Sequence, residues 1–171
     1  MESSRVTWKI SVSGLNGSGK STLISRMVYN SNNVGLQPKP IQRKIVNLEW
    51  KGGKITAELL FLEISSERDG ERLLTGSNAI IVVSDLTNAR SLDYAENILK
   101  FVTGMRNKSV TVLAATKLDL RYSAQFWEDE LQTVSKRYKI PYFIVNSKSG
   151  SEWERMYSYI TENLIQVFVK K

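Results

Sequence analysis

The chain contains no cysteine and no histidine among its 171 residues. The absence of cysteine excludes disulfide bonds, thiolate catalysis and the attachment of prenyl or palmitoyl groups. Because histidine is also missing, proton transfer and metal binding must rely on carboxylates, hydroxyls and the backbone. Residue 2 is Glu2, which is incompatible with N-terminal myristoylation. The sequence therefore predicts a protein without a lipid anchor.

Long hydrophobic runs are missing as well. No apolar stretch reaches the roughly 18 residues that a membrane-spanning helix needs, and the opening stretch MESSRVTWKI does not resemble a secretory signal. Hydrophobic residues make up 42% of the chain and charged residues 24%, which is typical of a soluble globular protein. We therefore expect one cytoplasmic domain that spans residues 1–171.

Basic residues outnumber acidic ones, but they are spread along the sequence. Lys and Arg number 24 against 17 Asp and Glu, which gives a formal charge of +7, and no long block of basic residues occurs. Such an excess favours contact with an anion, although a bound triphosphate would itself be one. Nucleic-acid binding is accordingly not expected as the main function.

The hydrophobic pattern predicts alternating strands and helices. Strands are expected at 5–13, 43–50, 54–64, 79–85, 109–117 and 141–147, and helices at 20–30, 91–103, 124–138 and 151–169. The second and third strands flank a Lys-Gly-Gly turn and form a hairpin, and Ser151 and Glu154 form a capping box at the last helix. Segments 30–40 and 65–78 are expected to be loops, the latter with at most a short helix. This order indicates an α/β fold with a six-stranded, mostly parallel sheet, one antiparallel edge strand and helices on both faces.

The strongest motif follows the first strand directly. Residues 13–22 read SGLNGSGKST and match G-x-x-x-x-G-K-[ST], with Gly14, Gly19, Lys20 and Ser21 at the fixed positions. Glycines let such a loop turn so that its N–H groups point at phosphate oxygens, and the following helix adds its positive end. The Lys can reach the β- and γ-phosphates and the Ser can ligate Mg²⁺. The motif predicts phosphate contacts from Asn16, Gly17, Ser18, Gly19, Lys20, Ser21 and Thr22.

Two weaker motifs follow later strands and point to a guanine base. ATKLD ends the fifth strand, where the Asp119 carboxylate can accept hydrogen bonds from the ring N–H and the exocyclic amine of guanine. The stem of Lys117 can lie over the base, and Thr116 can brace the loop. VNSKS follows the sixth strand, where Ser147 and Lys148 could offer backbone amides to the guanine oxygen. Each motif is weak alone, but their order and their positions at strand ends predict a guanine-nucleotide site.

With these motifs the chain resembles the Ras superfamily of small GTPases over essentially its whole length. GLNGSGKS is similar to the family's phosphate loop, TKLD to its N/T-K-x-D motif, and Asn146-Ser147-Lys148 to its S-A-K motif. The resemblance implies a P-loop fold, GTP and GDP with Mg²⁺ as ligands, and a nucleotide-dependent switch. The missing lipid sites make the chain most similar to the bacterial and archaeal members.

The catalytic half departs from the family pattern. No Ser or Thr lies between Ser31 and Thr56, where the family has its Mg²⁺-binding Thr, and Asn16 stands where many relatives have glycine. The family's D-x-x-G is matched either by Glu63–Ser66, which we prefer because Glu63 ends the third strand, or by 67–70 in the following loop. In the first register Glu63 could hold Mg²⁺ through water, and Glu67 takes the place of the family's water-orienting Gln.

These departures leave the activity open. Slow GTP hydrolysis by a switch protein is the preferred hypothesis, with Glu67 as the catalytic candidate. A non-hydrolysing guanine-nucleotide module with a constitutive partner surface is the second, and an ATP-dependent phosphotransferase the third. Residues 38–54 carry a basic segment countered nearby only by Glu49, and we expect a regulatory or effector protein there; solvated charges that discourage pairing at the sheet edge are the alternative. The basic residues of this segment are Lys39, Arg43, Lys44, Lys51 and Lys54.

Overall fold

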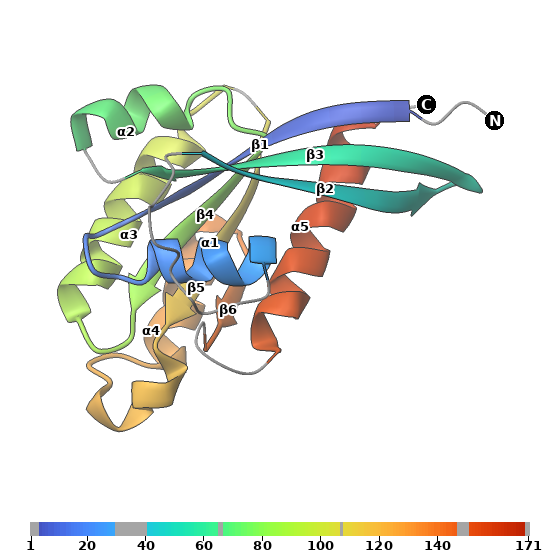
Figure 1. The fold of residues 1–171 in the computed structure, drawn as a ribbon. Helices are drawn as coiled ribbons and strands as arrows, with labels where there is room; N and C mark the ends of the chain where they lie inside the picture. The colour runs from blue at the N-terminus through green and yellow to red at the C-terminus, as the bar shows by residue number, and fades with distance from the viewer. Residues whose placement is uncertain (1–3, 30–40, 65–66, 107, 147–150, 170–171) are drawn as a thin grey trace.

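The computed structural model describes residues 4–29, 41–64, 67–106, 108–146 and 151–169, without the side chains of 67–69. It contains a single twisted sheet with helices on both sides (Figure 1). No helix in these ranges is long and apolar enough to cross a membrane.

Six strands form the sheet in the spatial order β2–β3–β1–β4–β5–β6. Their bounds are β1 Ser4–Gly14, β2 Ile41–Trp50, β3 Gly53–Ile64, β4 Ala79–Asp85, β5 Val110–Thr116 and β6 Tyr142–Ile144. All neighbouring pairs are parallel except β2 and β3, which form the antiparallel edge hairpin. The predicted mostly parallel sheet with one antiparallel edge strand is confirmed.

Five α-helices cover the two faces in the described part of the chain. They are α1 Lys20–Tyr29, α2 Glu67–Leu74, α3 Ala89–Thr103, α4 Glu128–Tyr138 and α5 Glu152–Phe168. Helices α1 and α5 bury their apolar stripes against one face, and α2, α3 and α4 against the other (Figure 1). The predicted stripe of α5 is confirmed, since Trp153, Met156, Ile160 and Leu164 are all buried.

The burial of the strands explains their sequences. Every residue of β4 is buried, because helices cover both faces of the sheet at its centre, and this strand is a continuous apolar run. Strand β2 at the edge instead alternates exposed and half-buried residues. The hairpin turn between β2 and β3 places Lys51 and Gly52 at positive φ, as a tight two-residue connection requires.

The parallel arrangement brings the predicted motifs to one edge of the sheet. Gly14, Ile64, Asp85 and Thr116 each end a strand, and the four strands run in the same direction. In open α/β sheets, ligands bind outside the carboxyl ends of the strands. This edge therefore holds the candidate site.

Several predicted boundaries are wrong. The helix expected at 124–138 begins only at Glu128, and a 3₁₀ helix, Leu118–Ser123, precedes it. The carboxylate of Glu130 accepts the backbone N–H of Trp127 at 2.9 Å, which fixes the later start of α4. The last strand, expected at 141–147, spans only Tyr142–Ile144, because β6 pairs with β5 over three residues.

The capping box predicted at the start of α5 is not formed. The helix begins at Glu152, as expected, but the side chain of Ser151 makes no capping hydrogen bond. Its carbonyl oxygen instead accepts the N–H of Glu154 at 3.0 Å, so the first turn is closed by backbone alone. The sequence signature was present, yet the Ser151 backbone, with ψ at 12°, is not in the extended region that an N-cap residue normally adopts.

Candidate functional site

The loop between β1 and α1 depends on glycine at two positions. A Cβ at Gly14 would lie 2.6 Å from the carbonyl oxygen of Val83 on β4, which the packed sheet does not allow. Gly19 has a φ of +94°, and a Cβ there would also approach the Thr116 side chain. Between them, the N–H of Ser18 donates to the carbonyl of Leu15 at 3.1 Å and closes the turn. The predicted phosphate loop thus has the backbone shape that its motif requires.

Lys20 lies inside this loop and is almost fully buried, with 3% exposure. Its Nζ donates to the carbonyl oxygens of Gly14 at 2.6 Å and Leu15 at 3.2 Å. Burial lowers the pKa of Lys20, and the nearby charge of Glu63 partly opposes that shift. The hydroxyl of Ser18 is buried with no hydrogen-bond partner among the described residues. A buried ammonium beside an unsatisfied hydroxyl forms a donor set that suits a phosphate group.

The candidate metal ligands lie on either side of the loop. Ser21 and Thr22 follow Lys20 in the first turn of α1 and are half-buried. Glu63, next to last in β3, lies beside Val12 in the sheet register. The described residues contain no cluster of three or more acidic side chains that could hold a metal by themselves. Mg²⁺ would therefore be shared between Ser21, Glu63 through water and oxygens of the bound nucleotide, which suits this ion.

Thr116 joins the end of β5 to the phosphate loop. Its Oγ1 lies 2.5 Å from the carbonyl oxygen of Ser18 and 3.1 Å from that of Ser84. Because a hydroxyl has one proton, the shorter contact to Ser18 is the better hydrogen bond. Thr116 is 1% exposed, so losing this partner would leave a buried carbonyl unsatisfied. The residue braces the loop that the sequence assigned to phosphate.

Lys117 makes a second connection between the two loops. Its Nζ donates to the carbonyl oxygen of Gly17 at 3.0 Å and forms an ion pair with Asp85 Oδ2 at 2.8 Å. The residue has a φ of 67° and a ψ of 38°, a left-handed conformation that is uncommon outside glycine. Strained backbone of this kind persists where surrounding contacts hold it, often at functional sites. These contacts put the TKLD loop directly beside the phosphate loop.

Asp85 is a site residue that the sequence reasoning missed. Its side chain is 6% exposed and accepts, besides Lys117, the N–H of Thr87 at 2.8 Å and the hydroxyl of Thr87 at 2.7 Å. Burial by itself raises the pKa of Asp85, but the hydrogen bonds from Lys117 and Thr87 and the charge of Lys117 together bring it below its usual value. The sequence did contain a signal for this residue, because Asp85 is a carboxylate at the end of a largely apolar strand.

The remaining base-binding candidates are only partly described. Asp119 lies in the first turn of the 3₁₀ helix and is exposed at the edge where the strands end. Asn146 follows β6 and is half-buried. Ser147 and Lys148 lie outside the described residues, so their assignment stays a prediction.

The structure describes the catalytic candidates only in part. Asn16 is exposed in the turn of the phosphate loop, where the sequence put it. Glu67 is the first residue of α2, but its side chain is not among those described. The alternative register, 67–70, was expected in a loop and lies instead in α2, with Gly70 packed beside a methyl group of Ile64. The preferred register from Glu63 runs into residues 65 and 66, outside the described ranges.

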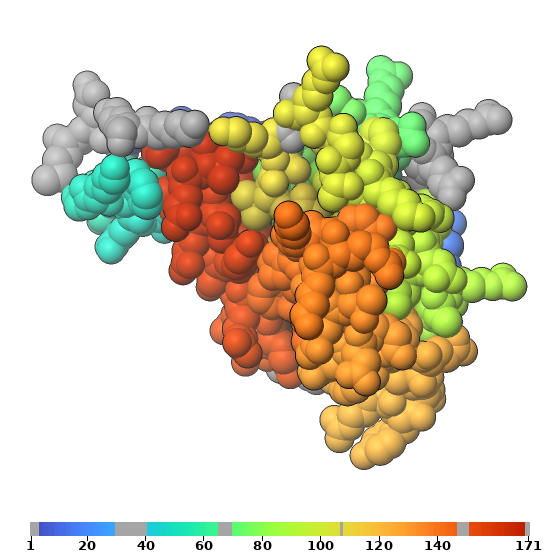
Figure 2. All heavy atoms as spheres, turned by 180° about the vertical axis from the view of Figure 1, so that it is seen from behind, coloured from blue at the N-terminus to red at the C-terminus, as the bar shows by residue number. Residues whose placement is uncertain are grey.

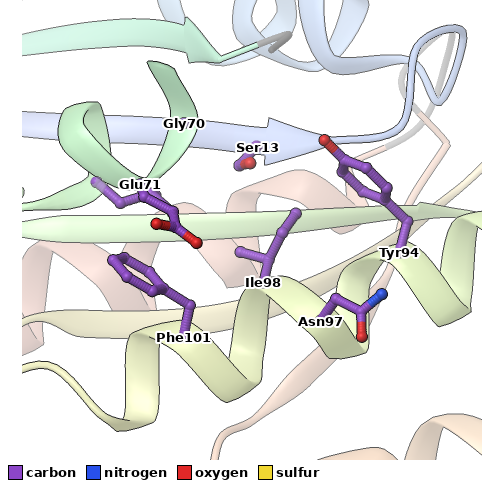
Figure 3. A pocket seen from close by; sticks show the side chains of 8 residues that line it. Ser13, Gly70, Glu71, Tyr94, Asn97, Ile98 and Phe101 are labelled. Carbon is purple, nitrogen blue, oxygen red and sulfur yellow. The ribbon is translucent and has the colours of Figure 1, made fainter. Parts of the chain in front are cut away.

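A pocket of about 250 Å³ opens between α2 and α3, beside the end of β1 (Figure 3). Ser13, which immediately precedes the phosphate loop, forms its floor, and Glu71 and Tyr94 point into it from the two helices. Apolar side chains from Leu74, Ile98 and Phe101 complete the walls. No sequence pattern predicted this pocket, because it arises from the packing of α2 across α3.

The structure corrects the prediction that Glu49 alone counters the basic segment at 38–54. Glu58, on the neighbouring strand β3, pairs with Arg43 at 3.1 Å and with Arg5 at 3.6 Å, so Glu49 is not the only acidic residue nearby. Lys44 is half-buried and points inward, where its Nζ donates to the carbonyl of Met27 at 2.6 Å and lies 4.6 Å from the centre of the Tyr157 ring. Lys39 lies outside the described residues. The exposed face of β2 therefore carries less positive charge than the sequence of residues 38–54 suggests.

Comparison with known proteins finds similarity to Ras-related proteins. The family model described as "Ras family" matches residues 9–166. "Ras-related protein SEC4" from Candida albicans is 26% identical over 167 residues, which cover 92% of this chain and 77% of the relative. "Ras-related protein rapC" from Dictyostelium discoideum is 25% identical over 154 residues, 82% of this chain and 53% of the relative.

Proposed function

This chain belongs to the Ras family of small GTP-binding proteins, and on that premise we propose that it is a guanine-nucleotide switch with slow intrinsic GTP hydrolysis. The observation that carries the proposal is the pair of contacts between the loops for base and phosphate. Thr116 and Lys117 bind the carbonyls of Ser18 and Gly17, so the two recognition loops form one rigid unit. A preorganised unit of this kind favours tight nucleotide binding.

The binding half supplies groups for the phosphates, the base and the metal ion. Lys20 and the N–H groups of 16–22 would hold the β- and γ-phosphates, and Asp119 would read the guanine edge. Ser21 and a water on Glu63 would hold Mg²⁺, which neutralises charge on the phosphates when bound. The half-buried Ser21 next to Lys20 is compatible with that role.

The hydrolytic half lacks parts that the family uses. No Ser or Thr is available between Ser31 and Thr56, and two prolines, Pro38 and Pro40, remove backbone N–H groups from the same stretch. Glu67 would bring a negative charge toward the γ-phosphate, which repels it, so the carboxylate would not be held where it could orient the attacking water. Asn16, at the exposed tip of the loop, adds a side chain where glycine leaves space. We infer that hydrolysis is limited at the γ-phosphate.

Replacement of the two unusual residues tests this inference. Glu67→Gln combined with Asn16→Gly should raise the single-turnover rate of GTP hydrolysis about tenfold, which corresponds to about 1.4 kcal/mol of the barrier. Glu71→Gln, the same change one turn further along α2, is the matched control and should leave the rate unchanged. An unaltered rate in the double variant would show that neither residue limits hydrolysis.

The non-hydrolysing module is the second candidate, and the same departures favour it. Single-turnover measurements with and without Mg²⁺ separate the two: a switch releases phosphate only when Mg²⁺ is present, and a module releases none in either case. A thermal-shift titration that compares GTP with ATP tests the phosphotransferase, which would respond to ATP.

The outer face of β2 is our proposed docking surface for a regulatory or effector protein. Ile41 and Ile45 are 52% and 55% exposed and flank Arg43 on this face. Large exposed apolar side chains next to a cation are common in protein interfaces. Lys44 is excluded from the surface by its inward contacts.

An acidic partner at this face should depend on its two outward cations. Arg43→Gln with Lys54→Gln should reduce recovery of the partner in a low-salt pull-down about fivefold, or about 1 kcal/mol for two exposed pairs. The control, Arg90→Gln with Arg155→Gln, removes the same charge at exposed positions on α3 and α5. Equal recovery by both variants would exclude a charge-dependent partner on β2.

A further inference from the structure

A cationic surface lies at the end of the molecule opposite the nucleotide site. Helices α3 and α4 run against the strands, so their carboxyl ends lie where β5 and β6 begin. We define the basic end as five exposed residues at this place: Lys100, Arg106, Lys108, Lys136 and Lys139. Figure 2 shows their segments, yellow after α3 and orange for α4, side by side with the red helix α5.

Acidic residues are absent from the two stretches of sequence that carry these five cations. None occurs from residue 97 to 118 or from 131 to 151. Glu96, just before the first stretch, is already in an ion pair with Arg137. In the described part of the chain, none of the five cations forms an ion pair. Five of the 24 Lys and Arg residues of the chain are therefore gathered here without an ion pair among the described residues.

Helix termini account for only part of this charge. Lys100 and Lys136 lie in the last turns of α3 and α4, where cations complement the helix dipole. Arg106 and Lys108 belong instead to the connection before β5, and Lys139 follows the last residue of α4 in a left-handed conformation. The cluster is therefore larger than helix capping requires.

A shallow apolar hollow of about 360 Å³ lies within the basic end. Val102 of α3, Ile140 after α4 and Val167 of α5 line it, and Lys108 and Thr111 line it as well. Phosphate groups alone would cover the cations and leave this apolar surface in water. A ligand surface that is anionic outside and apolar beneath would cover both.

We propose that the basic end binds the surface of a membrane that contains anionic phospholipids. Headgroup phosphates and carboxylates would contact the five cations, and the apolar hollow would lie against the boundary of the acyl chains. Docking in this orientation leaves the strand ends, with Lys20 and Asp119, facing away from the membrane. Nucleic acid fits less well, because no aromatic side chain lines the hollow to stack on a base. The five cations would supply this membrane contact by electrostatic attraction, independently of any attached lipid.

Vesicle sedimentation with the full chain tests the proposal. Wild-type protein should sediment with vesicles of phosphatidylcholine and about 30% phosphatidylserine in about 0.1 M salt, and should be released in about 0.5 M salt. Vesicles of phosphatidylcholine alone should not retain it. The triple variant Lys100→Gln, Lys108→Gln, Lys139→Gln should lose partitioning by roughly a hundredfold, since each cation near such a surface contributes strongly.

A matched triple variant controls for net charge. Arg90→Gln, Arg121→Gln and Arg155→Gln remove three exposed cations outside the basic end, and this variant should bind vesicles as the wild type does. Circular dichroism spectra and melting temperatures of both variants establish that they fold. Equal loss in the two variants, or binding of neutral vesicles, would overturn the proposal. Retention of a DNA duplex by the wild type with no retention by anionic vesicles would overturn it in favour of nucleic acid.

Discussion

Lys20→Ala should nearly abolish the binding of GTP. The side chain is 3% exposed, and its ammonium already lies inside the phosphate loop against the carbonyls of Gly14 and Leu15. Each charge-assisted hydrogen bond of this type contributes about 1.5–3 kcal/mol. Losing two of them should weaken binding by about 3–6 kcal/mol, or roughly 10²- to 10⁴-fold. Isothermal titration calorimetry with GTP measures the loss directly.

The control for this variant is Lys100→Ala, an exposed lysine at the far end of α3. It removes the same group and the same charge without touching the phosphate loop, and its affinity for GTP should not change. Lys20→Ala should also keep its fold, because the buried carbonyls of Gly14 and Leu15 can be solvated by water in the space the side chain vacates. Unchanged GTP affinity in a folded Lys20→Ala protein would remove the phosphate-loop assignment.

Asp119→Asn should change base specificity from guanine to xanthine. The carboxylate can accept two N–H donors from guanine, and their loss should reduce GTP affinity by about 3–6 kcal/mol, or roughly 10²- to 10⁴-fold. Asp119 is exposed in the structure, where water competes for its oxygens, so the lower part of this range is the better expectation. The new amide can still accept one hydrogen bond and can donate another to the carbonyl that replaces the exocyclic amine in xanthine. The variant should therefore lose GTP and gain XTP.

Competition between GTP, ATP and XTP for a fluorescent nucleotide measures this change. Asp93→Asn, an exposed carboxylate on α3, is the matched control and should keep the preference of the wild type. The wild type should also prefer GTP over ATP by a comparable factor, because adenine offers no such donor pair. If Asp119→Asn binds GTP like the wild type and gains nothing for XTP, the carboxylate does not read the base.

Features that depend on neighbours in sequence were predicted well. The motif of the phosphate loop could be recognised before the fold was known because it lies within residues 14–21, although the contact that excludes a side chain at Gly14 comes from Val83 on β4. The buried strands were equally clear, since β4 is a continuous apolar run. The boundaries of α4 were wrong because a 3₁₀ turn and a side-chain cap at Glu130 decided where the helix began.

Features that depend on residues far apart in the chain could not be predicted. Lys117 contacts Gly17 across 100 positions, and no pattern in the sequence indicates that their loops are joined or that Asp85 receives the same ammonium. Glu58 neutralises Arg43 because antiparallel pairing of β2 with β3 brings the two side chains to the same face. A count of charges along residues 38–54 could not include a carboxylate from the next strand.

The sequence by itself determined which chemical groups this protein can offer: a phosphate loop with its lysine, a base loop with its carboxylate, and no cysteine or histidine. These follow from residue identity and local backbone geometry, which a short motif specifies. Only the tertiary structure decided which groups act together, that Lys44 turns inward while Arg43 faces out, and that five separate cations share one end of the molecule. Electrostatic and hydrogen-bond energies depend on distances in space, and for distant residues the packing of helices on the sheet sets those distances.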